Sequence, residues 1–347
     1  MHFENDIVKR ISIKDVALKA GVSIASVSYV LNNKIDSRIS KDTIEKVKKA
    51  AEELNYRPNN VAKSLKTQRT HIIGLIVADI ANPYFSQIAR IIEDEANKIG
   101  YTLLIGSSDE NAEKFESLIN MFCDRQADGL IIAPVENTAI HLQKLEKQKM
   151  PFVLIDRFLD NIDASSIQIN NYEISQKVTE HLIANGYKNI VLVAYKTALK
   201  HLLQRNLGFV DTLEREKLKH QNAVLNIDKD AIDDDINLGL DHLFQSKTQQ
   251  PDAIFFTSNK LAVSGLKKLV QLSLNVPTDV AVVAFDEAEA YELFTTPITF
   301  VKQPLALIGR TAVQMLNTKI SDRLTPIEHI VLEAELRIGQ SSKLKST

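Results

Sequence analysis

Short apolar runs, separated by helical patterns, recur along most of the 347-residue chain and limit its fold more than any other feature. The runs start roughly 25 residues apart in the first half. They are Ile72–Val77, Thr102–Ile105, Gly129–Ile132 and Phe152–Ile155, followed by Asn189–Val193, Ala253–Phe256 and Val280–Phe285. Apolar strands joined by helices are typical of parallel sheets buried on both faces. The sequence therefore predicts an α/β fold with two doubly wound lobes and a ligand cleft at the carboxyl ends of their strands.

The first 58 residues follow a different pattern, that of three short helices. One helix face has the i, i+3, i+4, i+7 spacing at Ile13, Val16, Ala17 and Ala20. Gly21 allows a tight left-handed turn, and Ser23 is a good N-cap for a second helix that ends near Leu31. A third helix, capped by Ser40, is expected to end near Leu54. This arrangement predicts a helix-turn-helix domain, with a generic three-helix packing unit as the alternative.

Charge is distributed unevenly along the chain. Residues 1–70 contain 14 Lys and Arg against 8 Asp and Glu, whereas the rest contains 28 against 36. A basic segment on an acidic body favours a polyanion as the partner of the basic segment. A chance fluctuation in composition explains the same numbers, so charge alone leaves both readings open.

Several motifs in order make the chain resemble the lac repressor (LacI/GalR) family of bacterial regulators. They run from Ile13-Lys14-Asp15-Val16-Ala17 through Gly21-Val22-Ser23 to Tyr56-Arg57-Pro58-Asn59 and Ala62-Lys63-Ser64-Leu65. The resemblance implies a helix-turn-helix domain at 1–58, a hinge at 59–70 and a periplasmic-binding-protein-like clamshell at 71–347. Lobe 1 would comprise about 71–169 and 303–326, and lobe 2 about 170–300 and 328–340. Crossings between lobes are expected near 169–171, 300–304 and 325–328, with Gln303-Pro304 as a structural crossing motif.

Candidate DNA contacts come first from the second helix. They are the N-cap and the side chains of its outward face: Ser23, Ile24, Ala25, Ser28 and Tyr29. Arg38, in the following loop, is a candidate for a phosphate or base contact. The resemblance adds the hinge residues Asn59, Lys63 and Leu65, the last as a minor-groove wedge. Because apolar side chains contact thymine methyls, Ile24 and Ala25 favour an A·T-leaning half-site.

Candidate effector contacts follow the strand ends. Asn82, Tyr84 and Phe85 come after the first strand, where a ring can stack on a sugar and Asn82 can bind a hydroxyl. An Asx-type turn with a core phenylalanine is the structural alternative. The resemblance assigns charge-assisted effector contacts to Asp156 and Arg205. Further candidates follow later strands, namely Asn259, Lys260 and Asp286.

Lys260 departs from the family pattern, in which many members have an aspartate that binds sugar hydroxyls. A cation at this position suggests an anionic effector, such as a uronate or sugar phosphate. The alternative is that Lys260 points into solvent at the start of its helix.

Signatures of other protein classes are missing from the sequence. It has no Gly-x-Gly-x-x-Gly, Gly-x-x-x-x-Gly-Lys or Gly-x-Ser-x-Gly motif, and its single Cys123 lies on an apolar helix stripe. We therefore expect no catalytic residue, no metal and no cofactor. The start lacks a secretory signal and no apolar stretch is long enough to span a membrane, so a cytoplasmic location is expected. A clamshell binding protein or a carbohydrate-processing enzyme without a DNA role remains the rival interpretation.

The expected function is that of an allosteric, sequence-specific DNA-binding regulator, most simply a repressor. Two protomers would present two recognition helices to a pseudo-palindromic operator, and a sugar or sugar derivative, including an anionic one, would bind between the lobes. The polar segment after Gly339 is too short for a tetramerising coiled coil, which favours a homodimer. The effector would act by binding the DNA-competent and DNA-incompetent states with different affinities.

Overall fold

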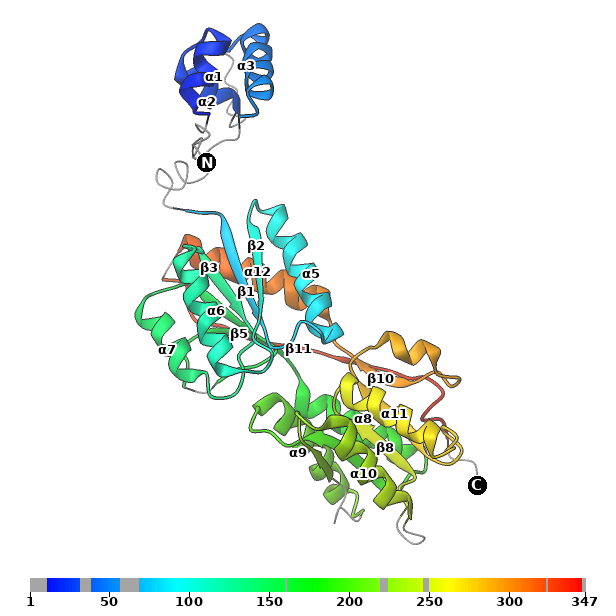
Figure 1. Ribbon diagram of the computed structural model, residues 1–347. Helices are drawn as coiled ribbons and strands as arrows, with labels where there is room; N and C mark the ends of the chain where they lie inside the picture. Colours follow the sequence, from blue (N-terminus) through cyan, green and yellow to red (C-terminus); the bar gives the residue numbers. More distant parts are fainter. Residues whose placement is uncertain are drawn as a thin grey trace, which may run out of the picture. The chain divides into compact units, whose positions relative to one another are not determined.

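The computed structural model describes residues 11–31, 39–56, 69–159, 161–218, 224–245, 250–322 and 324–344. The chain divides into two compact units, Met1–Thr70 and His71–Thr347 (Figure 1).

The N-terminal unit contains α1 (Ile13–Ala20), α2 (Ile24–Leu31) and α3 (Lys41–Glu53). Gly21 ends α1 in the left-handed conformation, with φ of 64°, which glycine adopts without steric cost. Side-chain oxygens cap the next two helices, since Ser23 accepts from the Ser26 N–H and Ser40 accepts from the Thr43 N–H. The small core consists of Val16, Ala17, Val27, Val30, Val47, Ala50 and Ala51. The predicted helix-turn-helix arrangement is confirmed.

The first lobe of the larger unit is built on a six-stranded sheet in the order β11-β5-β4-β3-β1-β2. Its strands are β1 (Ile72–Val77), β2 (Thr102–Ser107), β3 (Gly129–Ile132), β4 (Phe152–Ile155), β5 (Ser165–Ile169) and β11 (His329–Leu332). Its helices are α5 (Pro83–Lys98), α6 (Ala112–Asp124), α7 (Ala139–Lys147) and α12 (Leu305–Ser321), with α5 and α12 packed together (Figure 1). All neighbouring strands pair in parallel, as their apolar runs predict.

The second lobe repeats this design in a sheet of order β12-β10-β9-β8-β6-β7. Its strands are β6 (Ile190–Tyr195), β7 (Val224–Ile227), β8 (Ala253–Phe256), β9 (Ala281–Phe285), β10 (Thr299–Lys302) and β12 (Glu335–Arg337). The helices are α8 (Asn171–Ala184), α9 (Lys200–Arg215), α10 (Ile232–Gln245), α11 (Asn259–Gln271) and the 3-10 helix η1 (Glu289–Leu293). Helix α8 packs on α9 and α10 on α11, and β12 alone runs antiparallel to its neighbour.

The third crossing between the lobes differs from the expected position. The expectation placed it at 325–328 and assigned 328–340 to lobe 2. Strand β11 instead pairs in parallel with β5 of the first sheet, from His329↔Ser166 to Leu332↔Ile169. The chain therefore crosses between Leu332 and Glu335, because β11 completes the first sheet before β12 joins the second.

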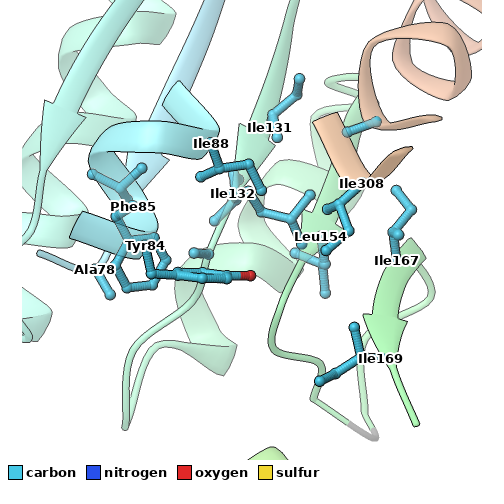
Figure 2. Close-up of a cluster of buried hydrophobic side chains, with 14 of the residues drawn as sticks. Ala78, Tyr84, Phe85, Ile88, Ile131, Ile132, Leu154, Ile167, Ile169 and Ile308 are labelled. Carbon is cyan, nitrogen blue, oxygen red and sulfur yellow. The ribbon is translucent and has the colours of Figure 1, made fainter. Parts of the chain in front are cut away.

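Buried aliphatic side chains fill the first lobe between its sheet and helices. Ile131 and Ile132 of β3 and Leu154 of β4 are no more than 1% exposed. Figure 2 shows them beside Tyr84 and Phe85, which lie at the start of α5. This core therefore holds the two aromatic rings at the carboxyl end of the sheet, where the cleft opens.

Candidate functional site

The outward face of α2 carries the residues that the sequence assigns to DNA. Ser23, Ala25, Ile24 and Tyr29 are exposed, the last two by 45% and 51% of their surfaces, while Ser28 is half-buried. Val27 and Val30 on the opposite face are buried in the small core. The helix thus presents an apolar, tyrosine-bearing surface. The other DNA candidates, namely Arg38, Asn59, Lys63 and Leu65, lie outside the described residues.

A cavity of about 540 Å³ lies between the two sheets of the larger unit. Residues after the strands of both lobes line it, which is where a doubly wound fold binds ligands. Of the predicted effector contacts, seven line this cavity: Asn82, Tyr84, Phe85, Asp156, Arg205, Lys260 and Asp286. Asn259 is not among the residues that line it.

Asp156 and Asp286 occupy equivalent places in the two lobes. Each follows the third strand of its sheet, β4 or β9. Each has a positive φ, 64° and 67°, and each donates its N–H to a neighbouring strand, to Ile167 at 2.9 Å and Val301 at 3.0 Å. Aspartate tolerates this left-handed conformation better than most residues do. The repeated fold therefore directs one buried carboxyl group into the cavity from each lobe.

Arg205 is the central cation of the cavity and is 3% exposed. Its Nε donates to Asn171 Oδ1 and its Nη1 to the Thr257 carbonyl, both at 2.8 Å. The guanidinium lies 3.5 Å from the ring centroid of Phe285, a cation–π arrangement. These contacts fix the plane of the side chain, so that its charge can act on both buried aspartates.

Burial sets the protonation of the two aspartates. It raises the pKa of Asp286 to about 6, against the effects of the Arg205 charge and the hydrogen bond from Gln303 Nε2 at 2.6 Å. Burial also raises the pKa of Asp156, although Arg157 and Arg205 oppose it. Both groups are thus partly deprived of water, a state in which hydrogen bonds from a ligand are strong.

Tyr84 and Phe85 form the aromatic wall, with ring centroids 4.9 Å apart in an edge-to-face arrangement. They are 6% and 3% exposed, so both are core residues that also line the cavity. Burial, followed by the charges of Asp156 and Asp286, raises the pKa of Tyr84 well above its usual range. Figure 2 shows its hydroxyl at the end of the buried ring. The phenol therefore remains protonated and able to donate.

Arg157 is a lining residue that the sequence reasoning missed. It is 7% exposed, its guanidinium forms a two-pronged pair with Glu110 at 2.9 and 2.6 Å, and it lies 5.7 Å from the Phe85 centroid. A signal was present, because Arg157 follows Asp156 directly after a buried strand.

His201 and Glu136, which also line the cavity, were missed as well. The buried His201 Nδ1 and Gln303 Oε1 have no hydrogen-bond partner within the described part of the chain. Burial, with the charges of Arg157 and Arg205, holds the pKa of His201 well below its usual range, so the ring is neutral. Gln303, expected to be purely structural, also lines the cavity. These unsatisfied polar atoms are ready to bind a ligand.

Three predicted residues contact the opposite lobe. Asn259 Nδ2 donates to Asn82 Oδ1 at 2.9 Å, and Lys260 Nζ forms an ion pair with Asp79. An anionic effector was expected because Lys260 was taken to be an unpaired cation. In the structure, the carboxylate of Asp79 neutralises the charge of Lys260.

No group of three or more His, Cys, Asp or Glu able to hold a metal ion occurs among the residues that the structure describes. Within the same residues, no helix combines the length and hydrophobicity needed to cross a bilayer.

Comparison with known families matches both units. Residues 12–59 match the model of bacterial regulatory proteins of the lacI family, and residues 179–342 match a periplasmic binding protein-like domain. The chain is 31% identical over 340 residues to the HTH-type transcriptional repressor PurR of Histophilus somni (strain 2336), covering 96% of this chain and 99% of that one. It is 27% identical over 332 residues to the HTH-type transcriptional regulator KdgR of Bacillus subtilis (strain 168), covering 95% and 97%.

Solved structures agree with these matches. A lac repressor dimer bound to operator and the anti-inducer ONPF superposes with a TM-score of 0.83 at 25% identity, covering 96% of this chain and 100% of that one. The complex of the transcriptional regulator CelR with cellobiose has a TM-score of 0.70 at 25% identity and the same coverage. The small helical unit, the two-sheet clamshell and a relative 31% identical over nearly the whole length together show that this chain belongs to the lacI family of bacterial regulatory proteins, effector-controlled transcriptional regulators that bind DNA.

Proposed function

We propose that this regulator is a homodimeric repressor whose effector is an uncharged, polyhydroxylated molecule of the sugar class. One observation carries the proposal: Arg205 lines the same cavity as the aromatic wall and as two buried aspartates, Asp156 and Asp286, which both interact with its charge. Sugar hydroxyls both donate and accept, so they can satisfy carboxylates and a guanidinium together, while the apolar face of the ring packs on an aromatic. The lac repressor and CelR structures, with ONPF and cellobiose, support this ligand class.

The charges of the cavity favour a neutral effector over an anionic one. Its acidic lining residues are Asp79, Asp109, Glu110, Glu136, Asp156, Asp228, Asp230 and Asp286, and its basic ones are Arg157, Lys196, Arg205, Lys229 and Lys260. Ion pairs already occupy three of those cations, Arg157 with Glu110, Lys229 with Asp230 and Lys260 with Asp79. A carboxylate or phosphate entering the cavity would meet more negative than positive charge. Its loss of hydration would weaken binding further.

For DNA recognition, we propose that α2 enters the major groove with its exposed face toward the bases. Ile24 and Ala25 would contact thymine methyls, and Tyr29 would contact a base edge or the backbone. These contacts would again favour a half-site rich in A·T pairs. Ser23, at the helix N-terminus, would bind a phosphate.

The remaining parts of the proposal concern assembly and location. Two-fold symmetric dimers match pseudo-palindromic operators, and the lac repressor relative is a dimer on its operator. A protein that binds the bacterial chromosome acts in the cytoplasm, and we propose that location. We propose no catalytic activity, in keeping with the named relatives, which are transcriptional regulators.

Two measurements test the proposal on the full-length protein. Selection from random duplexes should return a palindromic, A·T-leaning site whose affinity falls steeply with salt. Calorimetric titration with a panel of neutral sugars and their uronic acid counterparts should show binding of a neutral member that shifts operator affinity. Binding of acids alone would overturn the neutral effector, and a folded protein that ignores every duplex would overturn the regulator.

A further inference from the structure

We propose that Asp79 and Lys260 form a latch that closes the cleft between the lobes, and that Lys260 acts on effector binding by holding this closure rather than by touching the effector. The latch acts on the closed state of the protein itself, whichever effector binds.

The ion pair joins two rigid points of the two lobes. Asp79 follows β1 in the first lobe, and its Oδ1 accepts the Ala81 N–H at 2.9 Å, which fixes the carboxylate. Lys260 lies in the first turn of α11 in the second lobe. The side chains are 20% and 39% exposed, so the pair lies at the mouth of the cleft and not in its interior.

Lys260 lines two neighbouring hollows of the larger unit. Its side chain lines both the 540 Å³ cavity and an outer hollow of about 600 Å³ that contains Ala81 and Pro83 of the first lobe and Val263 of the second. Lys229, Asp230 and Ile232 line both hollows as well, and of these four shared residues Lys260 is the one that pairs with the first lobe.

A hydrogen bond beside the ion pair also joins the two lobes. Asn259 Nδ2 donates to Asn82 Oδ1 at 2.9 Å, while Asn259 Oδ1 accepts the Lys260 N–H at 2.7 Å. Asn82 Oδ1 also caps α5 by accepting the Tyr84 N–H at 3.1 Å. The latch thus connects the N-terminal ends of α5 and α11. The same N-terminal end of α5 carries Tyr84 and Phe85, the aromatic wall of the cavity.

A second bridge joins the lobes at other lining residues of the cavity. Glu136 Oε1 of the first lobe accepts from Thr197 Oγ1 at 2.5 Å and from the Ala198 N–H at 2.9 Å in the second lobe. The lobes are therefore joined at two separate places, by protein groups alone in each case. If the closed state is populated before the effector arrives, the effector needs less of its own binding energy to close the cleft.

Interlobe distance measurements on the full-length protein test the latch directly. Spin labels would be placed at Asn120→Cys on α6 and Leu238→Cys on α10, both exposed, in a Cys123→Ala background. Dilution with unlabelled protein keeps the signal within one protomer. Asp79→Asn retains the acceptor for Ala81 but loses the charge, and Lys260→Met retains the length of the side chain.

We expect both variants to lengthen and broaden the interlobe distance and to lower the closed-to-open ratio by about 1.5- to 5-fold, the range for a partly exposed ion pair. The double variant should behave like either single one, because the two changes remove the same contact. Lys260→Arg should remain closed, and 1 M salt should lower the closed-to-open ratio of the wild type by no more than the two variants do.

Lys114→Ala is the matched control, since it breaks the Lys114–Asp109 pair inside the first lobe. Its distance distribution should equal that of the wild type, and circular dichroism would show that every variant is folded. Distributions for Asp79→Asn and Lys260→Met that superimpose on the wild type would overturn the latch, whatever the effector proves to be.

Discussion

We expect the buried carboxylate of Asp286 to lower the stability of the folded protein and to strengthen effector binding, and both effects can be measured. Its pKa rises from an ordinary 3.8 to about 6 in the folded protein because the carboxyl is buried. The folded state therefore binds more protons than the unfolded state between those values, so the free energy of unfolding falls as pH rises through this window. Above about pH 6 the buried carboxylate is ionised and lowers the free energy of unfolding by its full amount. The difference in pKa corresponds to about 3 kcal/mol.

Asp286→Asn removes this penalty and retains an acceptor for Gln303 Nε2, which lies 2.6 Å from Oδ1. We expect the variant to be more stable than the wild type at pH 7.5 by up to about 3 kcal/mol, and nearly equal to it at pH 3.5. At the same time it should bind the effector more weakly, since it loses a charge-assisted hydrogen bond.

Urea unfolding, followed by circular dichroism at a series of pH values, measures the difference between the two proteins. The exposed Asp163→Asn is the control, and it should leave the pH dependence unchanged. A variant that is less stable than the wild type at pH 7.5, with the same pH dependence, would refute the assignment of a buried, destabilising charge to Asp286.

Three further results are expected. Tyr29→Ala should weaken specific operator binding by about 1–3 kcal/mol while leaving nonspecific binding unchanged, as measured by fluorescence anisotropy; equal losses on both kinds of DNA would contradict a base contact. Asp79→Asn should raise affinity for a uronic acid relative to the matching neutral sugar in calorimetry, because it leaves the Lys260 charge without its carboxylate; an unchanged ratio would argue against that charge reaching the cavity. Gly208→Ala should lower the free energy of unfolding by about 1–3 kcal/mol, since the added Cβ would lie 2.3 Å from the Tyr172 carbonyl, and a neutral result would mean that α8 and α9 can separate at little cost.

Local signals explain why much of the site was predictable. The carboxyl ends of buried strands meet at one edge of a sheet, so Asp156 and Asp286 could be assigned from their positions after apolar runs. The same rule, applied one residue further, would have included Arg157. His201 was out of reach, because it lies in the first turn of a helix and only the packing around it shows that it faces the cavity.

The third crossing shows where local patterns fail. Strand β11 is four residues long and alternates between exposed and half-buried positions, so it lacks the continuous apolar run of the inner strands. Its assignment to the first sheet depends on pairing with β5, more than 160 residues earlier. Short edge strands of this kind carry too little hydrophobic signal to reveal their partner.

The sequence by itself determined the helix-turn-helix, the two doubly wound lobes and the edge of the sheets at which the cavity lies, because helix periodicity, capping residues and apolar runs act over a few neighbouring residues. Only the tertiary structure decided which charges neutralise one another. Lys260 reads as a free cation along the chain, yet it is paired with Asp79, 181 positions away and in the other lobe. Electrostatic interactions depend on distance in space, and the folding of two separate lobes toward each other sets that distance.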